Sequence, residues 1–165
     1  LPYDYIAVLI GDTITEGEVL HLKGIPRFSP EMFRYVNNVD PLKTKQLAKG
    51  LDQLMDEGVA QLFTKEFDGR KLIGTVGALQ FDVIQYRLLH EYGASVQFEP
   101  VNLYKACWIS AEKDSDLQAF LQRRKRDLAK DKSGKWVYLA ESPWALKLLQ
   151  ENNPEITFHF ISEFE

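Results

Sequence analysis

Apolar and polar positions change in short blocks along the first two thirds of the chain. The runs 32–36, 60–67, 71–76 and 94–98 are rich in β-branched and aromatic residues. In the run 32–36, Phe33 and Tyr35 fall on one face of a pleated strand. Runs of this length between turn residues predict strands.

Two longer segments repeat apolar residues at three- and four-residue spacing, which predicts amphipathic helices. The first follows Asp40 and Pro41, because Asp caps a helix N-terminus and Pro suits its first turn. This helix is expected to end at Gly58, and the second at Gly93, since glycine adopts the left-handed stop. The apolar positions are Leu47, Leu51, Leu54 and Met55 in the first helix, and Leu79, Val83, Ile84, Leu88 and Leu89 in the second.

These elements follow one another as strand, helix, strand, strand, helix, strand. Asp68 and Gly69 supply a tight turn between the second and third strands. This order predicts an α+β fold with the ferredoxin-like split β-α-β arrangement, in which both helices cover one face of an antiparallel sheet.

The last third predicts a smaller α+β unit of strand, helix, strand, helix, strand. Strands are expected at 104–110, 135–140 and 156–160. A helix capped by Ser115 or Asp116 is expected between the first two strands, and Ser142-Pro143 begins another helix. The apolar side of the first of these helices carries Leu117, Phe120, Leu121 and Leu128.

The first residues do not form a complete unit. Two short strand-like runs, 6–10 and 19–22, cannot close a sheet alone. We expect residues 1–27 to be the tail of a domain whose body lies upstream, with an N-terminal hairpin packed on the next domain as the alternative. Pro100 marks a candidate boundary, so the predicted units are 1–27, 28–100 and 101–165.

Composition and charge fit a globular protein and exclude a globally basic nucleic-acid coat. The chain of 165 residues is 45% hydrophobic and 27% charged, and its net charge is −4. The single cysteine excludes an internal disulfide, and together with three histidines it argues against a structural zinc site. No apolar run approaches the ~20 residues of a membrane helix. We therefore expect a soluble cytoplasmic protein that binds no metal.

No motif points to catalysis. Gly74-Thr75-Val76-Gly77 lacks the Lys and Ser/Thr pair of a phosphate-binding loop, and more simply shapes a strand-to-helix turn. Cys107 lies in a predicted strand, where a cysteine is usually a small buried apolar residue. We predict no catalytic and no nucleotide-binding residue in this chain.

Two basic clusters are candidate binding surfaces. Residues 123–135 hold seven Lys or Arg and two Asp. Three- and four-residue spacing places Arg123, Arg126 and Lys130 on one helix stripe that can contact RNA phosphates or an acidic protein. The alternative is a solvated helix face with internal pairs such as Arg123 with Asp127. The second cluster, on the polar side of the first helix, has the same two interpretations and comprises Lys43, Lys45 and Lys49.

Several segments resemble the bacterial class II translational GTPases of the peptide chain release factor 3 family. These segments are 24–33, 40–58 and 74–92, and the resemblance is strong over about residues 10–110. Elongation factor G relatives share the general theme, but Leu79-Gln80-Phe81-Asp82 together with Asp40-Pro41-Leu42-Lys43 favours the release factor. Gly11-Asp12-Thr13 with Glu16-Gly17-Glu18 resembles the end of its second, β-barrel domain.

The resemblance implies a noncatalytic C-terminal domain. The parent protein would bind GTP or GDP with Mg in a separate N-terminal domain, so this chain would hold no cofactor. The expected partners are the ribosome, through small-subunit protein and rRNA, and the class I release factor that it helps to dissociate and recycle after peptide release. An alternative is a free-standing ferredoxin-like regulatory module that binds a small ligand. The candidate ribosome or RNA contacts are Arg123, Arg124, Arg126, Lys130, Lys43, Lys45 and Lys49.

Overall fold

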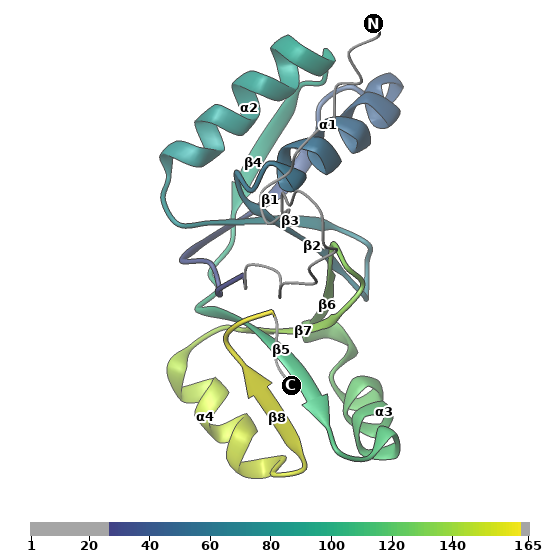
Figure 1. Cartoon of the computed structure of the whole chain (residues 1–165), viewed down its shortest axis with the longest axis vertical. Coiled ribbons are helices and arrows are strands. Elements are labelled where there is room, and N and C mark those ends of the chain that lie inside the picture. The colour runs from purple at the N-terminus through teal and green to yellow at the C-terminus, as the bar shows by residue number, and fades with distance from the viewer. Residues whose placement is uncertain (1–26, 163–165) are drawn as a thin grey trace, which may run out of the picture.

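The computed structural model of the chain describes residues 27–162 (Figure 1). The strands expected near the start of the chain lie outside the described residues. Within the described part, no helix is both long and apolar enough to cross a bilayer.

The first unit contains the predicted order of elements. Its elements are β1 (Met32–Asn38), the 3-10 helix η1 (Pro41–Lys43), α1 (Thr44–Asp56), β2 (Gln61–Lys65), β3 (Lys71–Thr75), α2 (Leu79–Tyr92) and β4 (Val96–Pro100). Asp40 accepts a hydrogen bond from the Leu42 backbone N–H at 3.0 Å, as expected of a capping residue. Gly93 ends α2 with φ = 66°, in the left-handed region that favours glycine. The expected ferredoxin-like unit is thus confirmed.

The second unit has one strand more than predicted. Its elements are β5 (Lys105–Ala111), α3 (Asp114–Arg123), the 3-10 helix η2 (Lys125–Asp127), β6 (Leu128–Asp131), β7 (Trp136–Ala140), α4 (Pro143–Asn152) and β8 (Ile156–His159). The unpredicted strand is β6, in which Leu128 pairs with Tyr138 of β7. With β6 included, the second unit repeats the β-α-β-β-α-β order of the first.

Helix α3 differs from its prediction at both ends. It begins at Asp114 rather than being capped by Ser115 or Asp116, so Asp114 and Asp116 lie in its first turn. Negative charge there favours the helix because it faces the unpaired backbone N–H groups. The helix ends at Arg123 and does not reach Leu128, which starts a strand instead.

The two units join edge to edge in one sheet. The eight strands follow the order β4-β1-β3-β2-β6-β7-β5-β8, and every neighbouring pair is antiparallel. Each unit places its second strand at the inner edge, where Thr64 of β2 pairs with Lys130 of β6. This pairing satisfies two strand edges that would otherwise be open to other chains. Because all eight strands belong to one sheet, the sheet itself marks no division at Pro100. The domain boundary there stays a prediction.

Three apolar clusters show how the sheet is layered. One cluster lies under α1 and α2, and a second lies under α3 and α4. The third lies between the helix-free faces of the two units, where the Phe63 and Trp108 rings are 6.2 Å apart. Its buried members are Phe33, Phe63, Leu72, Ala106, Trp108, Ala129, Val137 and Leu139. Figure 1 accordingly shows one helix pair at each end of the molecule and the strands between them.

The β2–β6 pairing and the apolar cluster around Phe63 and Trp108 form the joint between the units. Polar contacts reinforce this joint. The Trp108 indole Nε1 donates to Asp131 Oδ2 at 2.9 Å, which satisfies an N–H buried in the shared core. Lys132, in the β6–β7 turn, reaches α1 and forms ion pairs with Asp56 and, at 3.0 Å, with Asp52. Burial lowers the pKa of Lys132, but its hydrogen bonds to Asp56 and Asp52 outweigh that effect and leave the pKa raised. The two units are therefore joined by strand pairing, apolar packing and charge.

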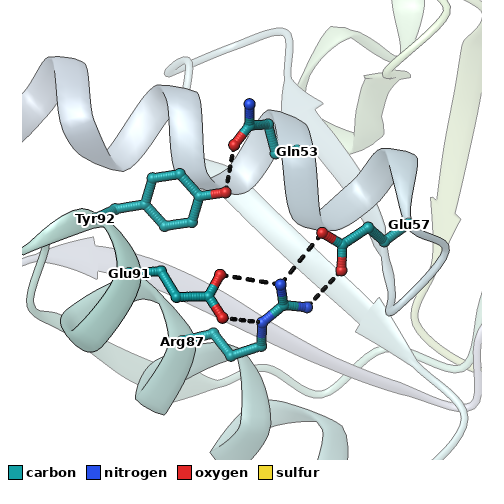
Figure 2. A network of polar contacts seen from close by, with 5 residues as sticks. All are labelled: Gln53, Glu57, Arg87, Glu91 and Tyr92. Carbon is teal, nitrogen blue, oxygen red and sulfur yellow. Dashed lines mark hydrogen bonds and ion pairs between the residues drawn. The ribbon is translucent and has the colours of Figure 1, made fainter. Parts of the chain in front are cut away.

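A second polar network joins α1 to α2 in the first unit (Figure 2). Arg87 binds Glu57 through Nη1 at 2.5 Å and Glu91 through Nε at 2.7 Å, and Tyr92 bonds to Gln53. The hydrogen bonds to Glu91 and Glu57 raise the pKa of Arg87, so its charge is held at every pH of interest. The helices approach closely at Gly50, where a Cβ would lie 2.7 Å from the Leu88 side chain.

Candidate nucleic-acid interface

The predicted basic residues are distributed over separate elements. Arg123 ends α3, Arg126 lies in η2 and Lys130 lies in β6. The prediction that these three residues share one helix stripe is wrong, because the chain leaves the helix after Arg123. The structure also separates them from the other cluster, since Lys43, Lys45 and Lys49 belong to η1 and α1 of the first unit.

Arg123 and Lys130 have structural contacts of their own. The Arg123 Nη2 donates to Asn153 Oδ1 at 3.1 Å and lies 3.4 Å from Glu155 Oε1, which ties the end of α3 to the start of β8. The Arg123–Asp127 pair, weighed as an alternative, is replaced by this contact. Lys130 is half-buried, with its Nζ 4.4 Å from the centre of the Trp136 ring. Both residues are thus partly occupied in holding the second unit together.

Arg124, Lys125 and Arg126 form an exposed basic run that begins one residue before η2 and continues into it. Within residues 27–162, none of the three makes an ion pair with a carboxylate. The Arg126 guanidinium lies 5.3 Å from the centre of the Phe67 ring, which is 57% exposed in the β2–β3 turn. A backbone hydrogen bond of 3.0 Å from Glu66 N to Leu128 O holds that turn against the start of β6. The first unit therefore contributes an aromatic ring to a basic surface of the second.

A cavity of about 250 Å³ is lined in part by Arg124. The cavity separates η2 from α4, and its apolar wall includes Trp144, which is 72% exposed, and Leu148. Asp127, Glu141 and Asn152 supply polar groups at the same cavity. Burial, followed by the nearby Asp127, raises the pKa of the lining Tyr138 to about 12, so its hydroxyl keeps its proton.

We call Phe67, Arg124, Lys125, Arg126 and Trp144 the η2 surface. The sequence analysis placed Phe67 in a strand and began a helix at Ser142-Pro143 without marking Trp144 as a surface residue, and so missed both. A usable signal was present in α4, because buried Leu146 and Leu149 occupy a different side from exposed Trp144 and Leu148. A helix with more apolar residues than one buried stripe needs leaves some of them for a partner.

The first unit carries its own basic surface. Lys45 and Lys49 are exposed on α1, and Leu42, 88% exposed, precedes them on the same side. The described residues supply no ion pair to Lys43, Lys45 or Lys49. This surface lacks exposed aromatic side chains of the kind that line the η2 surface.

A larger cavity of about 550 Å³ lies between the two units. Its lining includes Arg27, Lys132 and Lys135, but Lys132 is neutralised by its two aspartates. Gly74 and Thr75 also line it, and a Cβ at Gly74 would lie 2.4 Å from Pro30. Gly77 N donates to Gln80 Oε1 at 2.7 Å, so this segment forms a turn closed by its own contacts. These contacts support the interpretation of residues 74–77 as a strand-to-helix turn.

Two groups of potential reactivity lie in the second unit. Cys107 is fully buried, and burial raises the pKa of its thiol to about 12, which keeps it protonated and unreactive. Ser110 Oγ and His159 Nε2 are 2.7 Å apart across β5 and β8, and burial lowers the pKa of His159. No group of three or more potential metal ligands occurs in this described part.

The chain was compared with models of known protein families. A family model described as class II release factor RF3, C-terminal domain, matches residues 22–150. The match covers well over half of the chain and runs from before β1 into α4. The first unit, the joint between the units and the η2 surface lie within the matched segment, whereas the end of α4 and β8 of the second unit lie beyond it.

Proposed function

The chain belongs to the family of class II release factor RF3 C-terminal domains, and from this premise we propose that it is the noncatalytic, ribosome-binding domain of a translation-termination GTPase. Family membership places the chain in translation termination and protein biosynthesis. The nucleotide, GTP or GDP with Mg, would bind to another domain of the parent protein, in the cytoplasm of a bacterium.

The proposed task is to help remove the class I release factor from the ribosome after peptide release. A domain can shift the ribosome between two states only by binding one state more tightly than the other. Moving a 1:99 equilibrium to 99:1 needs about 5.5 kcal/mol of such difference. The partners would be small-subunit protein and rRNA, together with the class I release factor on the ribosome.

The joint between the units is the observation that supports this task. Paired β2 and β6 and the core around Phe63 and Trp108 make the two units one body. Because the two units form one body, binding that orients one unit also orients the other. Individual exposed ion pairs are worth only about 0–1 kcal/mol, so several contacts across a stiff domain are needed to contribute to the total.

Among the candidate contacts, the structure favours those that are exposed and make no ion pair within residues 27–162. Arg124 and Arg126 on the second unit and Lys45 and Lys49 on the first remain available to a ribosomal partner. Arg123 and Lys130 are secondary candidates, because Arg123 pairs with Glu155 and Lys130 is half-buried beside Trp136. Lys43 is half-buried and ranks with them.

Ribosome binding by this chain tests the proposal. We expect saturable binding to ribosomes that carry a class I release factor, weakening as salt rises because phosphate contacts release counterions. Arg126→Glu should weaken binding several-fold. Lys113→Glu is the matched control, since Lys113 is equally exposed but lies before α3, at the other end of that helix. Equal loss in both variants would show only a response to net charge and would count against a specific contact at η2.

The alternative of a small-ligand module gains no support from the cavity between the units. A ligand site is typically apolar with a few convergent polar groups. Here the lining mixes Asp56 and Asp131 with Lys132 and Lys135, and Lys132 is already paired. The family match favours the translation role over this alternative.

A further inference from the structure

We propose that the η2 surface binds single-stranded RNA, with an unpaired base against Trp144 and the backbone along Arg124, Lys125 and Arg126. This inference deepens the proposed function by naming the chemical form of the nucleic acid. The proposed function supplies only the source of the RNA, the ribosome. The preference for a single strand follows from the side chains of the η2 surface.

Trp144 is the side chain that a base would contact. It is 72% exposed at the first turn of α4, whereas the other two tryptophans are buried or half-buried. Burial in the core does not account for an indole in this position. Exposed aromatic faces next to cations are the usual platform on which proteins stack unpaired bases.

The cavity beside Trp144 suits a flat heterocycle. Its volume of about 250 Å³ lies below the range of roughly 300–1,000 Å³ typical of small-molecule sites. Trp144 and Leu148 supply an apolar part of a mainly polar lining, which also offers the carboxylates of Asp127 and Glu141, the Asn152 amide and the Arg124 guanidinium. Those groups provide both acceptors and donors for the edge of a base, which is how proteins read unpaired bases.

Phe67 and Arg126 provide a second aromatic and cationic pair nearby. Arg126 lies over the Phe67 ring, and both side chains are exposed. The two pairs are thus Trp144 with Arg124 and Phe67 with Arg126, whose arginines lie on either side of Lys125 in sequence. An RNA strand could place its phosphates along the basic run and its bases against the two rings. This arrangement needs an unstacked strand, because bases within a duplex are not available to either ring.

The local charge balance favours a single strand over a duplex. Glu66, Asp68, Asp127 and Glu141 lie on the same elements or at the cavity, and these four carboxylates outnumber the three cations, so the surface has no surplus of positive charge. A surface that bound a duplex would depend mainly on phosphate contacts and would need such a surplus. With three available cations, the logarithmic salt slope for a single strand should be about 2.

Fluorescence and polarisation on this chain together test the inference. A labelled oligoadenylate should bind saturably and quench the tryptophan emission, and its duplex with oligouridylate should bind at least tenfold more weakly. Trp144→Ala should lower the affinity for the single strand by about tenfold, the loss of one stacked base. Trp144→Phe should retain most of the affinity by polarisation but lose the quench, because it keeps a ring and removes the reporter.

Two control variants separate stacking from general surface effects. Tyr86→Ala removes an aromatic ring of similar exposure, 64%, from α2 of the first unit and should leave RNA affinity unchanged. Lys71→Gln with Lys113→Gln, at two exposed lysines away from η2, removes as much charge as Arg124→Gln with Arg126→Gln, but only the arginine pair should reduce affinity for the single strand more than fivefold.

Three results would overturn the inference. Equal binding of single strand and duplex would show that phosphate charge alone drives the interaction. Full affinity in Trp144→Ala would show that no base stacks on Trp144. Displacement of the RNA by oligoglutamate in wild type and Trp144→Ala alike would identify a surface for acidic protein.

Ribosome binding, measured separately, distinguishes failure of this inference from failure of the proposed function. If any of the three results is found while the chain still binds ribosomes, the proposed function stands. If the chain stacks RNA bases but does not bind ribosomes, only the proposed function is contradicted.

Discussion

The two units share one topology but use their helices and surfaces differently. In the first unit, Arg87 with Glu57 and Glu91 holds α1 against α2, and Gly50 allows a close approach (Figure 2). In the second unit, the ion pair that involves a helix runs from Arg123 to Glu155 beside β8. The second unit instead exposes the η2 surface. A repeated fold therefore supplies a scaffold, and function has to be argued from the side chains placed on it.

The joint between the units is where substitution should have the largest effect. Phe63→Ala removes a fully buried ring that contacts Phe33 and Trp108, and should cost about 3–5 kcal/mol of unfolding free energy. Because both units share this core, both should unfold in a single transition. Urea unfolding followed by far-UV circular dichroism, which reports on both units, and by tryptophan fluorescence, which reports on the second unit, tests this. Two separate transitions would mean that the units are independent.

Helix packing in the first unit should respond next. Gly50→Ala places a Cβ 2.7 Å from Leu88 and 2.9 Å from Tyr92. The overpacking should exceed the gain in helix propensity and leave a net loss of about 1–2 kcal/mol. Gly77→Ala is the control, because its Cβ meets only Gln80 Oε1, at 3.4 Å. A stabilised Gly50→Ala protein in thermal unfolding would show that α1 and α2 are less closely packed than described.

Arg87 in the first unit and Arg123 in the second each hold a helix in place, and the cost of replacing them can be compared. Arg87→Gln should cost about 1 kcal/mol, since it breaks bonds to two carboxylates across α1 and α2. Arg123→Gln should cost less, because its pair with Glu155 is long, at 3.4 Å, and the Arg123 side chain is 56% exposed. Between low and high salt, the unfolding free energy from urea titration should change more for wild type than for Arg87→Gln. Equal costs would contradict the difference in how the units hold their helices.

The smallest expected effect is a pH dependence in the second unit. Burial lowers the pKa of His159 in the folded chain, so protonation favours the unfolded state. The stabilisation is present above the ordinary histidine pKa of about 6.5 and is lost as pH falls below it. His159→Gln should flatten the decrease in unfolding free energy between neutral and mildly acidic pH. An unchanged pH profile in that variant would assign the decrease to other groups.

The sequence predicted what depends on local chemistry and missed what depends on distant partners. Asp40 and Ser142 cap their helices as expected, each accepting a backbone N–H at 3.0 Å, and Gly93 stops α2. Strand β6 was missed because Leu128 continues a helical spacing, and four residues with two charges give no strand signal. Its conformation depends on β2, which lies far away in the sequence, and on β7.

The same limit applies to the candidate site. The basic character of residues 123–126 was evident from the sequence, but its geometry was not, because the assumed helix ends at Arg123. Phe67 joins Arg126 only through the pairing of β2 with β6. Trp144 resembles a core residue by type, and only the folded unit shows that Leu146 and Leu149 already fill the core.

One measurement tests the central claim most directly, because it compares the two units in the same assay. Ribosome binding is measured at several salt concentrations for wild type, Arg124→Gln with Arg126→Gln, and Lys45→Gln with Lys49→Gln. The account predicts that the arginine pair on the second unit lowers affinity more than the lysine pair, because aromatic rings flank only the arginines. Unchanged binding in both double variants, or a larger loss from the lysine pair, would contradict it.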